Sequence, residues 1–421
     1  MEGKKVRIVG FDTATEKHEC VLLGIDGNED RSLSCRNRCK SIEEAFAKLI
    51  LRIAPDETLV VALEAPRAHG RLVFEVALQF GFTVWQVEAI ALNHYRRCEG
   101  QARKDDHWDA FLAARMVFKG MKGCRVVADP RPDERVLSRL IRLRAQMVKQ
   151  RVQLSHRLRA VMLELAPIVL DSQWKGPKLG SVAMRKILEK WPGFEGLGRA
   201  RTTSIRSIFR SCRYGQAKTD RCVALVHSLP KEIVIPPEER AVIAFEIEMI
   251  FKQLALLNQS ILEIEKKLRV AADQHPICRK LMEMPGIGLI TASVLVGELL
   301  PMARNATEPS SATFSGVTPL TRKSGTSLDS AHLGRASNKR VLNALFLSAV
   351  RALAESALDR AYYDKKRVDY QGHPKPHTAA TLALARQRHK VIFQLMTTEA
   401  RYDKEVLIAS HLKRQRELAA A

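Results

Sequence analysis

Four carboxylates occupy positions where strands end or a helix begins. Asp12 closes the apolar run RIVGFD, and Glu64 closes the run LVVALE. A carboxylate at the end of a central strand is costly unless it is paired or binds a metal. Asp106 and Asp109 follow in QARKDDHWDAF, and three residues apart on a helix they share one face. These four side chains are candidates for a metal site.

The spacing alone leaves other interpretations open. Asp12 could be an ordinary aspartate at a strand end or turn, and Asp105 shares a helix face with Asp109 as well as Asp106 does. Aspartates favour helix N-termini as caps and against the positive end of the dipole, which accounts for Asp105 and Asp106 better than for Asp109. If this helix lies against the sheet edge that carries Asp12 and Glu64, the carboxylates could hold Mg²⁺ or Mn²⁺. Two such ions about 4 Å apart support phosphodiester chemistry.

A serine lies in a cationic loop near the other end of the chain, FSGVTPLTRKSGTSLDSAHLGRASNKR. With a metal or base to activate it, Ser324 could attack phosphorus. Alternatively, the hydroxyls and cations of this loop merely hold phosphates. The cations concerned are Arg322, Lys323, Arg335, Lys339 and Arg340.

Upstream of this loop, the segment MPGIG stands between two helical patterns. It favours a helix–hairpin–helix, in which Gly286 and Gly288 let backbone N–H groups face a phosphate. A simple turn between helices is the alternative.

The elements around the first carboxylates alternate between strand and helix. Strands are predicted for VRIVGFDTA, HECVLLGID, RSLSCRN, TLVVALEA and FTVWQVE, and helices from Ser41, from about Gly70 to Phe80 and from about Asp105. Ser41 is predicted as an N-cap, with Glu44 completing a capping box. Three early strands followed by alternation indicate an α/β domain with a mixed sheet.

Two long helical patterns follow this domain. The first spans 134–165, and the second opens at Pro236-Pro237 and repeats Ile243, Ile250, Leu257 and Ile264 every seven residues. This spacing predicts a coiled coil, with ordinary helices on a globular core as the alternative. The first helix is rich in Arg and Lys, and Arg144 and Arg151 are candidates for nucleic-acid binding. Residues 170–235 read as irregular, and the rest of the chain as mostly helical apart from a loop at 315–338.

The charge of the chain indicates a polyanionic partner. Lys and Arg number 69 against 46 Asp and Glu, a formal net charge of +23. Such an excess is typical of proteins that bind nucleic acid, although a merely basic protein is the alternative.

The eight cysteines are scattered, which favours free thiols in a reducing cytoplasm. No signal peptide and no membrane span of about 18 apolar residues is expected.

Several of these stretches together resemble the DEDD-type transposases of insertion sequences, also described as bridge-RNA-guided serine recombinases. The resemblance covers most of the chain. It rests on the following motifs: GFDTATEKHECVLLG, LVVALEA, ARKDDHWDAFLAAR, MPGIGLITASVLVGEL, FSGVTPLTRKSG, GRASNKRVLNALF and the tail YYDKKRVDYQGHPKPHTAATLALARQRHKVIF.

The resemblance implies a fold and a site. The fold would be a RuvC-like, RNase H-type domain (1–127), a coiled-coil and basic linker region (128–271) and a mostly helical C-terminal transposase domain (272–421). The site would combine four metal-binding acids, carried over onto Asp12, Glu64, Asp106 and Asp109, with Ser324 as the nucleophile. Lys104 belongs to the same motif and is a candidate contact to nucleic acid. The Lys-Thr-Asp-Arg-x-Asp-Ala motif departs from its usual form at Asp105 and His107.

We therefore expect a DNA recombinase that moves its own insertion element with Mg²⁺ or Mn²⁺. Donor and target DNA, a bridge RNA as guide and a homo-oligomer, either dimer or tetramer, would be its partners, in the cytoplasm and without a membrane. A RuvC-like hydrolytic nuclease or junction resolvase is the first alternative. A non-catalytic nucleic-acid scaffold built on the coiled coil is the second.

Overall fold

The computed structural model describes residues 5–64, 69–100, 105–127, 130–324, 328–333 and 337–403; the side chains of 231, 232, 319–324 and 328–333 are not included. By its contacts the chain divides into two units. The first joins Met1–Glu134 to Glu298–Ala421, and the second is Arg135–Gly297. The division at residues 127 and 271 stays a prediction.

The N-terminal part of the first unit is built on a six-stranded mixed sheet with the strand order β3-β2-β1-β4-β5-β6. Strands β1, β4 and β5 run parallel, whereas β2, β3 and β6 each pair antiparallel with a neighbour. The predicted α/β layout is thereby confirmed. The strands are β1 (Lys5–Thr13), β2 (Lys17–Leu23), β3 (Glu29–Arg36), β4 (Glu57–Leu63), β5 (Thr83–Val87) and β6 (Cys124–Val126).

Helices cover both faces of this sheet. One face packs with α1 (Cys39–Ile50) and α2 (Arg71–Gln79), and the other packs with α3 (Ala89–Cys98) and α4 (Asp106–Phe118). Because both faces are covered, the central strands carry unbroken apolar runs, such as LVVAL in β4. Strand β6 and helix α3 were not predicted.

The predicted cap of α1 is wrong. The helix begins at Cys39, and its N-cap residue, Arg38, makes no side-chain cap bond. The hydroxyl of Ser41 instead accepts a hydrogen bond from the amide of Arg36, at 3.0 Å. Ser41 therefore closes the turn that leads out of β3, which takes the hydroxyl away from the helix end.

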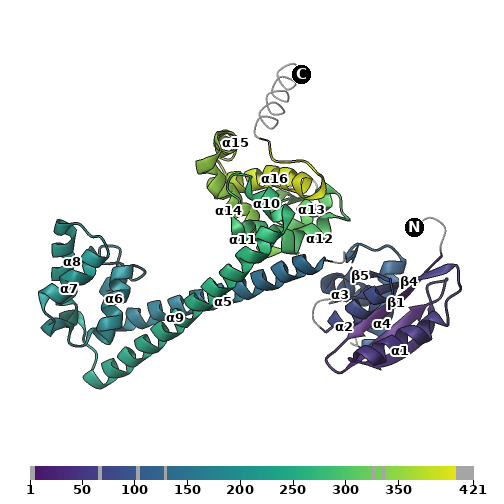
Figure 1. The fold of residues 1–421 in the computed structure, drawn as a ribbon, viewed down its shortest axis with the longest axis horizontal. Coiled ribbons are helices and arrows are strands. Elements are labelled where there is room, and N and C mark those ends of the chain that lie inside the picture. Colours follow the sequence, from purple (N-terminus) through teal and green to yellow (C-terminus); the bar gives the residue numbers. More distant parts are fainter. Residues whose placement is uncertain are drawn as a thin grey trace, which may run out of the picture. The chain divides into compact units, whose positions relative to one another are not determined.

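Two long helices, α5 (Pro132–Leu165) and α9 (Pro237–Gln274), run side by side in the second unit (Figure 1). Arg144 bonds to Glu265, Arg151 to Asn258 and Arg157 to Glu246, so residue numbers fall along one helix as they rise along the other. The two helices are therefore antiparallel. The predicted apolar positions of α9 are buried or half-buried, whereas coiled-coil packing itself stays a prediction.

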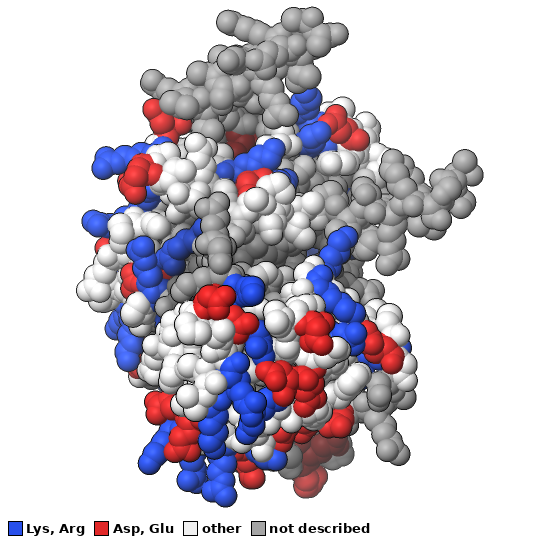
Figure 2. Space-filling view, turned by 90° about the vertical axis from the view of Figure 1, so that its right-hand side faces the viewer, with Lys and Arg blue, Asp and Glu red and all other residues white. Residues whose placement is uncertain are grey.

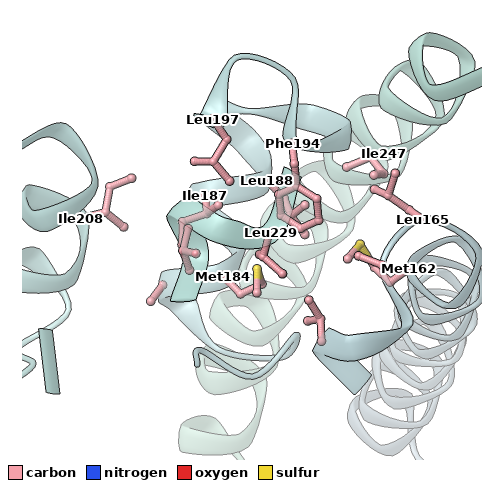
Figure 3. Packing of buried hydrophobic residues seen from close by; sticks show 14 of the residues in the cluster. Met162, Leu165, Met184, Ile187, Leu188, Phe194, Leu197, Ile208, Leu229 and Ile247 are labelled. Atoms are coloured by element: carbon pink, nitrogen blue, oxygen red, sulfur yellow. The ribbon is translucent and has the colours of Figure 1, made fainter. Parts of the chain in front are cut away.

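The segment predicted as irregular forms a small helical bundle where α5 ends and α9 begins. Its helices are α6 (Val182–Lys190), α7 (Thr202–Ser211) and α8 (Gln216–Ser228), with 3-10 turns at Pro167–Leu170, Pro192–Phe194, Leu197–Arg199 and Leu229–Glu232. Figure 3 shows Met184, Leu188, Phe194 and Leu229 packed between them and α9. The many Arg and Gly residues of this segment obscure its short amphipathic repeats, so these helices were not predicted.

Residues beyond α9 begin with α10 (Pro276–Met282) and α11 (Leu289–Val294), joined by a turn in which Gly286 has φ +77°. A π-helix, Leu295–Leu299, follows directly.

The C-terminal part of the first unit is largely helical. A two-stranded antiparallel hairpin occupies the predicted loop at 315–338. Within the described residues no single helix is long and apolar enough to cross a membrane. The helices Lys339–Glu355 and Ala357–Asp369 pass that test only as a pair, and they are bent by 110° at their junction. The elements are α12 (Leu300–Ala303), α13 (Glu308–Ser315), β7 (Pro319–Ser324), β8 (Leu328–Leu333), α14 (Lys339–Glu355), α15 (Ala357–Asp369) and α16 (Pro376–Thr397).

Candidate functional site

Asp12 and Glu64 lie at one edge of the sheet. Phe11 pairs in register with Leu63 across the parallel strands β1 and β4, so the next residues, Asp12 and Glu64, are neighbours at the carboxyl ends of these strands. Phe11 and Leu63 point into the core beneath α1 and α2. Side chains alternate along a strand, so Asp12 projects to the face covered by α4, and Glu64 follows β4 on the same side. Both carboxylates are half-buried.

A glycine brings α4 onto this strand. A Cβ added at Gly10 would stand 1.9 Å from the carbonyl oxygen of Ala110 and 2.8 Å from the amide of Ala114. The backbones of β1 and α4 therefore touch, which no other residue at position 10 would allow. Asp12 follows Gly10 by two residues and Asp109 directly precedes Ala110. This contact holds the helix that carries Asp109 against the strand that carries Asp12, whereas the convergence of the acids stays a prediction.

The three aspartates of α4 have different environments. Asp105 is the N-cap, and its side chain accepts from the amide of His107 at 3.1 Å. Asp106 is exposed at the first helical position. Asp109 is only 3% exposed, and Arg96 donates to its Oδ1. The capping role proposed for Asp105 is confirmed, and the role of Asp106 in the site stays a prediction.

A fifth carboxylate, Glu19, stands beside Asp12. The two residues are directly paired across β1 and β2, so their side chains share a face. Lys17 Nζ lies 2.7 Å from Glu19 Oε1, and this hydrogen bond raises the pKa of Lys17; the charge of Asp106 adds to the effect. Asp106 therefore lies within electrostatic reach of this strand pair. Sequence analysis missed Glu19, although the hairpin between β1 and β2 could have revealed it.

The predicted nucleophile lies on the hairpin of the C-terminal part. Ser324 is the last residue of β7 and pairs with Leu328 across the hairpin turn. Its side chain lies outside the described residues. The base of the hairpin is described: the amide of Asn338 donates to the carbonyl of Phe314 at 2.9 Å. Gly316, with φ +74°, approaches Ser337 so closely that a Cβ would stand 2.5 Å from its hydroxyl.

Glu298 also holds the base of the hairpin, through Asn338 and Arg340. This carboxylate is 3% exposed and accepts from Asn338 Nδ2 at 3.1 Å and from Arg340 Nη2 at 3.2 Å. Asn338 caps α14 in turn, because its Oδ1 accepts from the amides of Arg340 and Val341. Sequence analysis missed Glu298, since a glutamate in an apolar helical run gives no sign of a distant partner.

The predicted cationic contacts have mixed environments. Arg144 bonds to Glu265 at 2.7 Å and Arg151 to Asn258 at 3.3 Å, so both guanidiniums are engaged between α5 and α9. Lys339 donates to Ser337. Lys104 and Arg335 lie outside the described residues, as do the side chains of Arg322 and Lys323. Gly286 lies in the turn before α11, and Gly288 is its N-cap residue.

Charges of both signs are mixed on the face that Figure 2 shows. Lys and Arg are interspersed there with Asp and Glu, so on this face the excess of +23 does not form one uninterrupted cationic surface.

Two family models match this chain. A model of DEDD transposases of the IS110 kind matches residues 9–167, and a model described as transposase IS116/IS110/IS902 family matches residues 278–364. Together they span more than half of the chain. The chain belongs to the IS110 family of transposases. Enzymes of this family cleave and rejoin DNA, so this transposase acts on DNA.

Full-length relatives agree with this assignment. The transposase is 24% identical to an uncharacterized protein of insertion element IS110 from Streptomyces coelicolor, over 94% of this chain and 95% of the relative. It is 24% identical to an uncharacterized protein of IS116 from Streptomyces clavuligerus, over 92% and 94%. A putative mini-circle transposase for IS117 from Streptomyces coelicolor is 23% identical, over 96% and 97%.

Proposed function

We propose that this transposase moves its insertion element through a composite site. Asp12, Glu64, Asp106 and Asp109 hold divalent cations, and Ser324 is the nucleophile. The observation that carries the proposal is the backbone contact between Gly10 and α4, because it brings a helix that begins with two acids to the strand edge that bears the other two. The strand order 3-2-1-4-5 and the mixed pairing support a RuvC-like, RNase H-type domain.

The donor set fits Mg²⁺ or Mn²⁺. All four side chains offer carboxylate oxygens, the hard ligands these ions prefer, and none offers nitrogen or sulfur. Bringing these four negative charges together would be costly unless cations neutralised them. Bound ions would lower the pKa of the attacking hydroxyl and stabilise the charge that develops on the phosphate.

The chain's own residues then carry the exchange. The Ser324 oxygen bonds to phosphorus and loses its proton, while the bond from phosphorus to one deoxyribose oxygen breaks and that oxygen gains a proton. The phosphoserine conserves the bond energy, and a second hydroxyl reverses the step to rejoin the strands. The closed base of the hairpin at Phe314 and Asn338 supports this role, since a nucleophile needs a fixed platform.

The grouping of the chain into units also supports a composite site. The segments that carry the four acids and the hairpin both belong to the first unit, although the second unit separates them in sequence. As the family resemblance implies, a bridge RNA would choose the DNA sites and an oligomer would bring donor and target together. The basic helix α5 and the bundle at 170–235 would hold nucleic-acid backbones.

The decisive test is a covalent adduct. Wild-type protein incubated with donor DNA and Mg²⁺ should form a protein–DNA adduct that peptide mapping assigns to Ser324. Ser324→Ala should lose both the adduct and strand exchange, whereas Ser330→Ala in the partner strand β8 should keep both. Ser324→Ala protein that still cleaves at wild-type rates would instead favour a hydrolytic nuclease.

A further inference from the structure

Asp109 differs from the other proposed ligands because it already has a cationic partner. Both Nε and Nη2 of Arg96 reach the same oxygen, Oδ1, at 2.7 and 2.6 Å. The Asp109 side chain is 3% exposed and that of Arg96 is 15% exposed, so the pair is largely removed from water. A buried carboxylate is stable in its charged form only when it is paired.

The pair uses one oxygen of the carboxylate and spares the other. Within the part of the chain that the structure describes, Oδ2 of Asp109 accepts no hydrogen bond. A fork of two donors on Oδ1 restricts rotation of the carboxylate, so the direction of Oδ2 is set by Arg96. Partners of this kind orient metal ligands in many sites.

Arg96 is itself held in place from outside the acid cluster. It lies in the last turn of α3, whose Leu92 and Tyr95 are buried in the same core cluster as Ala110. Lys119, the C-cap residue of α4, donates to the Tyr95 hydroxyl at 3.0 Å and lies over its ring. The position of Arg96 therefore does not depend on the four acids alone.

We infer that Arg96 is a positioning residue for the metal site, which rests on the function proposed above. It fixes Oδ1 of Asp109 so that Oδ2 faces the cation. The neighbouring Arg97 provides a matched control, because it is exposed and makes no ion pair with the described residues.

The test measures metal binding rather than activity. Mn²⁺ is titrated into the full-length protein without DNA and followed by electron paramagnetic resonance. The variants are Arg96→Gln, Arg96→Lys, Arg97→Gln and, for the site itself, Asp12→Asn. We expect Arg96→Gln to weaken Mn²⁺ binding about 10- to 100-fold, as the loss of such a partner typically does. Arg96→Lys should fall between, since it keeps the charge but not the fork, and Arg97→Gln should bind like wild type.

The outcomes separate the two proposals. Unchanged or tighter binding in Arg96→Gln and Arg96→Lys, with weaker binding in Asp12→Asn, would overturn the role of Arg96 and leave the acid site standing. Wild-type binding in Asp12→Asn would overturn the acid site and with it the inference. Thermal unfolding of each variant shows whether a loss of binding is instead a loss of fold, and Arg96→Lys, the smaller change, then decides.

Discussion

The main-chain amide of Asn338 donates to the carbonyl of Phe314 at 2.9 Å, so the segment that carries Ser324 leaves and returns at one point. Gly316 and Ser337 close the same base by direct contact. The hairpin thus connects α13 to α14, and the start of α14 is fixed by Glu298 and the Asn338 cap. Under the proposed chemistry, the geometry of this base therefore influences the position of Ser324 and so the reaction.

Widening the base should impair the chemistry before it impairs DNA binding. Gly316→Ala adds a Cβ at φ +74° and within 2.5 Å of the Ser337 hydroxyl, so the base must open. We expect the yield of covalent adduct to fall at least about tenfold, the effect of a small misplacement of a reacting group. Gly372→Ala, where a Cβ meets nothing within 4 Å, is the matched control. Equal adduct yields in both variants would show that the base does not position the serine.

The three aspartates of α4 should separate by role. Asp106→Asn and Asp109→Asn should abolish metal-dependent cleavage, because each removes a proposed ligand charge. Asp105→Ala should keep most of the cleavage and lower the stability of the fold by about 1 kcal/mol, the usual effect of losing an N-cap. Gel-based cleavage assays and thermal unfolding measure the two effects. Full loss of cleavage in Asp105→Ala, without unfolding, would contradict this assignment.

Acid should destabilise the C-terminal helices through His389. This fully buried side chain lies 3.0 Å from the Ser311 hydroxyl and 2.9 Å from Glu308, and burial lowers its pKa although Glu308 opposes the shift. In the unfolded chain His389 takes up a proton near pH 6.5, whereas in the folded protein it does so only at lower pH. Stability should therefore fall as the pH drops below about 6.5.

The variant His389→Gln checks this prediction, because it removes the titrating group. Burial also lowers the pKa of His18, so the relevant quantity is the difference between wild type and variant. Urea unfolding at pH 7.5 and pH 5.5 should show a smaller loss of stability in the variant. Equal losses in both proteins would assign the pH dependence elsewhere.

The cations of α5 should contribute unequally to DNA binding. Arg159 is exposed, whereas the guanidinium of Arg144 is bonded to Glu265. We expect Arg159→Ala to lower the salt slope of binding by about one and Arg144→Ala to lower it less. Arg144→Ala should instead cost up to about 1 kcal/mol of stability. A larger change of slope in Arg144→Ala would show that nucleic acid displaces Glu265.

Local patterns predicted much of the fold. The strands of the sheet, the two long helices and the start of α4 were visible because period, caps and prolines act over a few residues. Strand β6, with three residues, and α3 were too short or too polar to show. The bundle at 170–235 was missed because its apolar residues are diluted by Arg and Gly. Its fold depends on packing against α9, which no local pattern contains.

The candidate site was predictable in its acids but not in their partners. Strand ends and helix spacing indicated Asp12, Glu64 and Asp109, with either Asp105 or Asp106 as a companion, and the family resemblance selected Asp106. Arg96 and Glu298 could not, because each acts on a residue that only the tertiary fold brings near, whereas Glu19 follows from the register of the β1–β2 hairpin. The contacts of these three residues follow from register and helix packing.

The contact of Gly10 with Ala110 and Ala114 joins main chain to main chain. At this point no side chain stands between the two elements, so the spacing there is set by the main chains themselves. The distance from Asp12 to the acids of α4 is in this sense a property of the backbone. Exchanging the acids or their partners leaves this contact as it is, whereas any side chain at position 10 would push α4 away from β1.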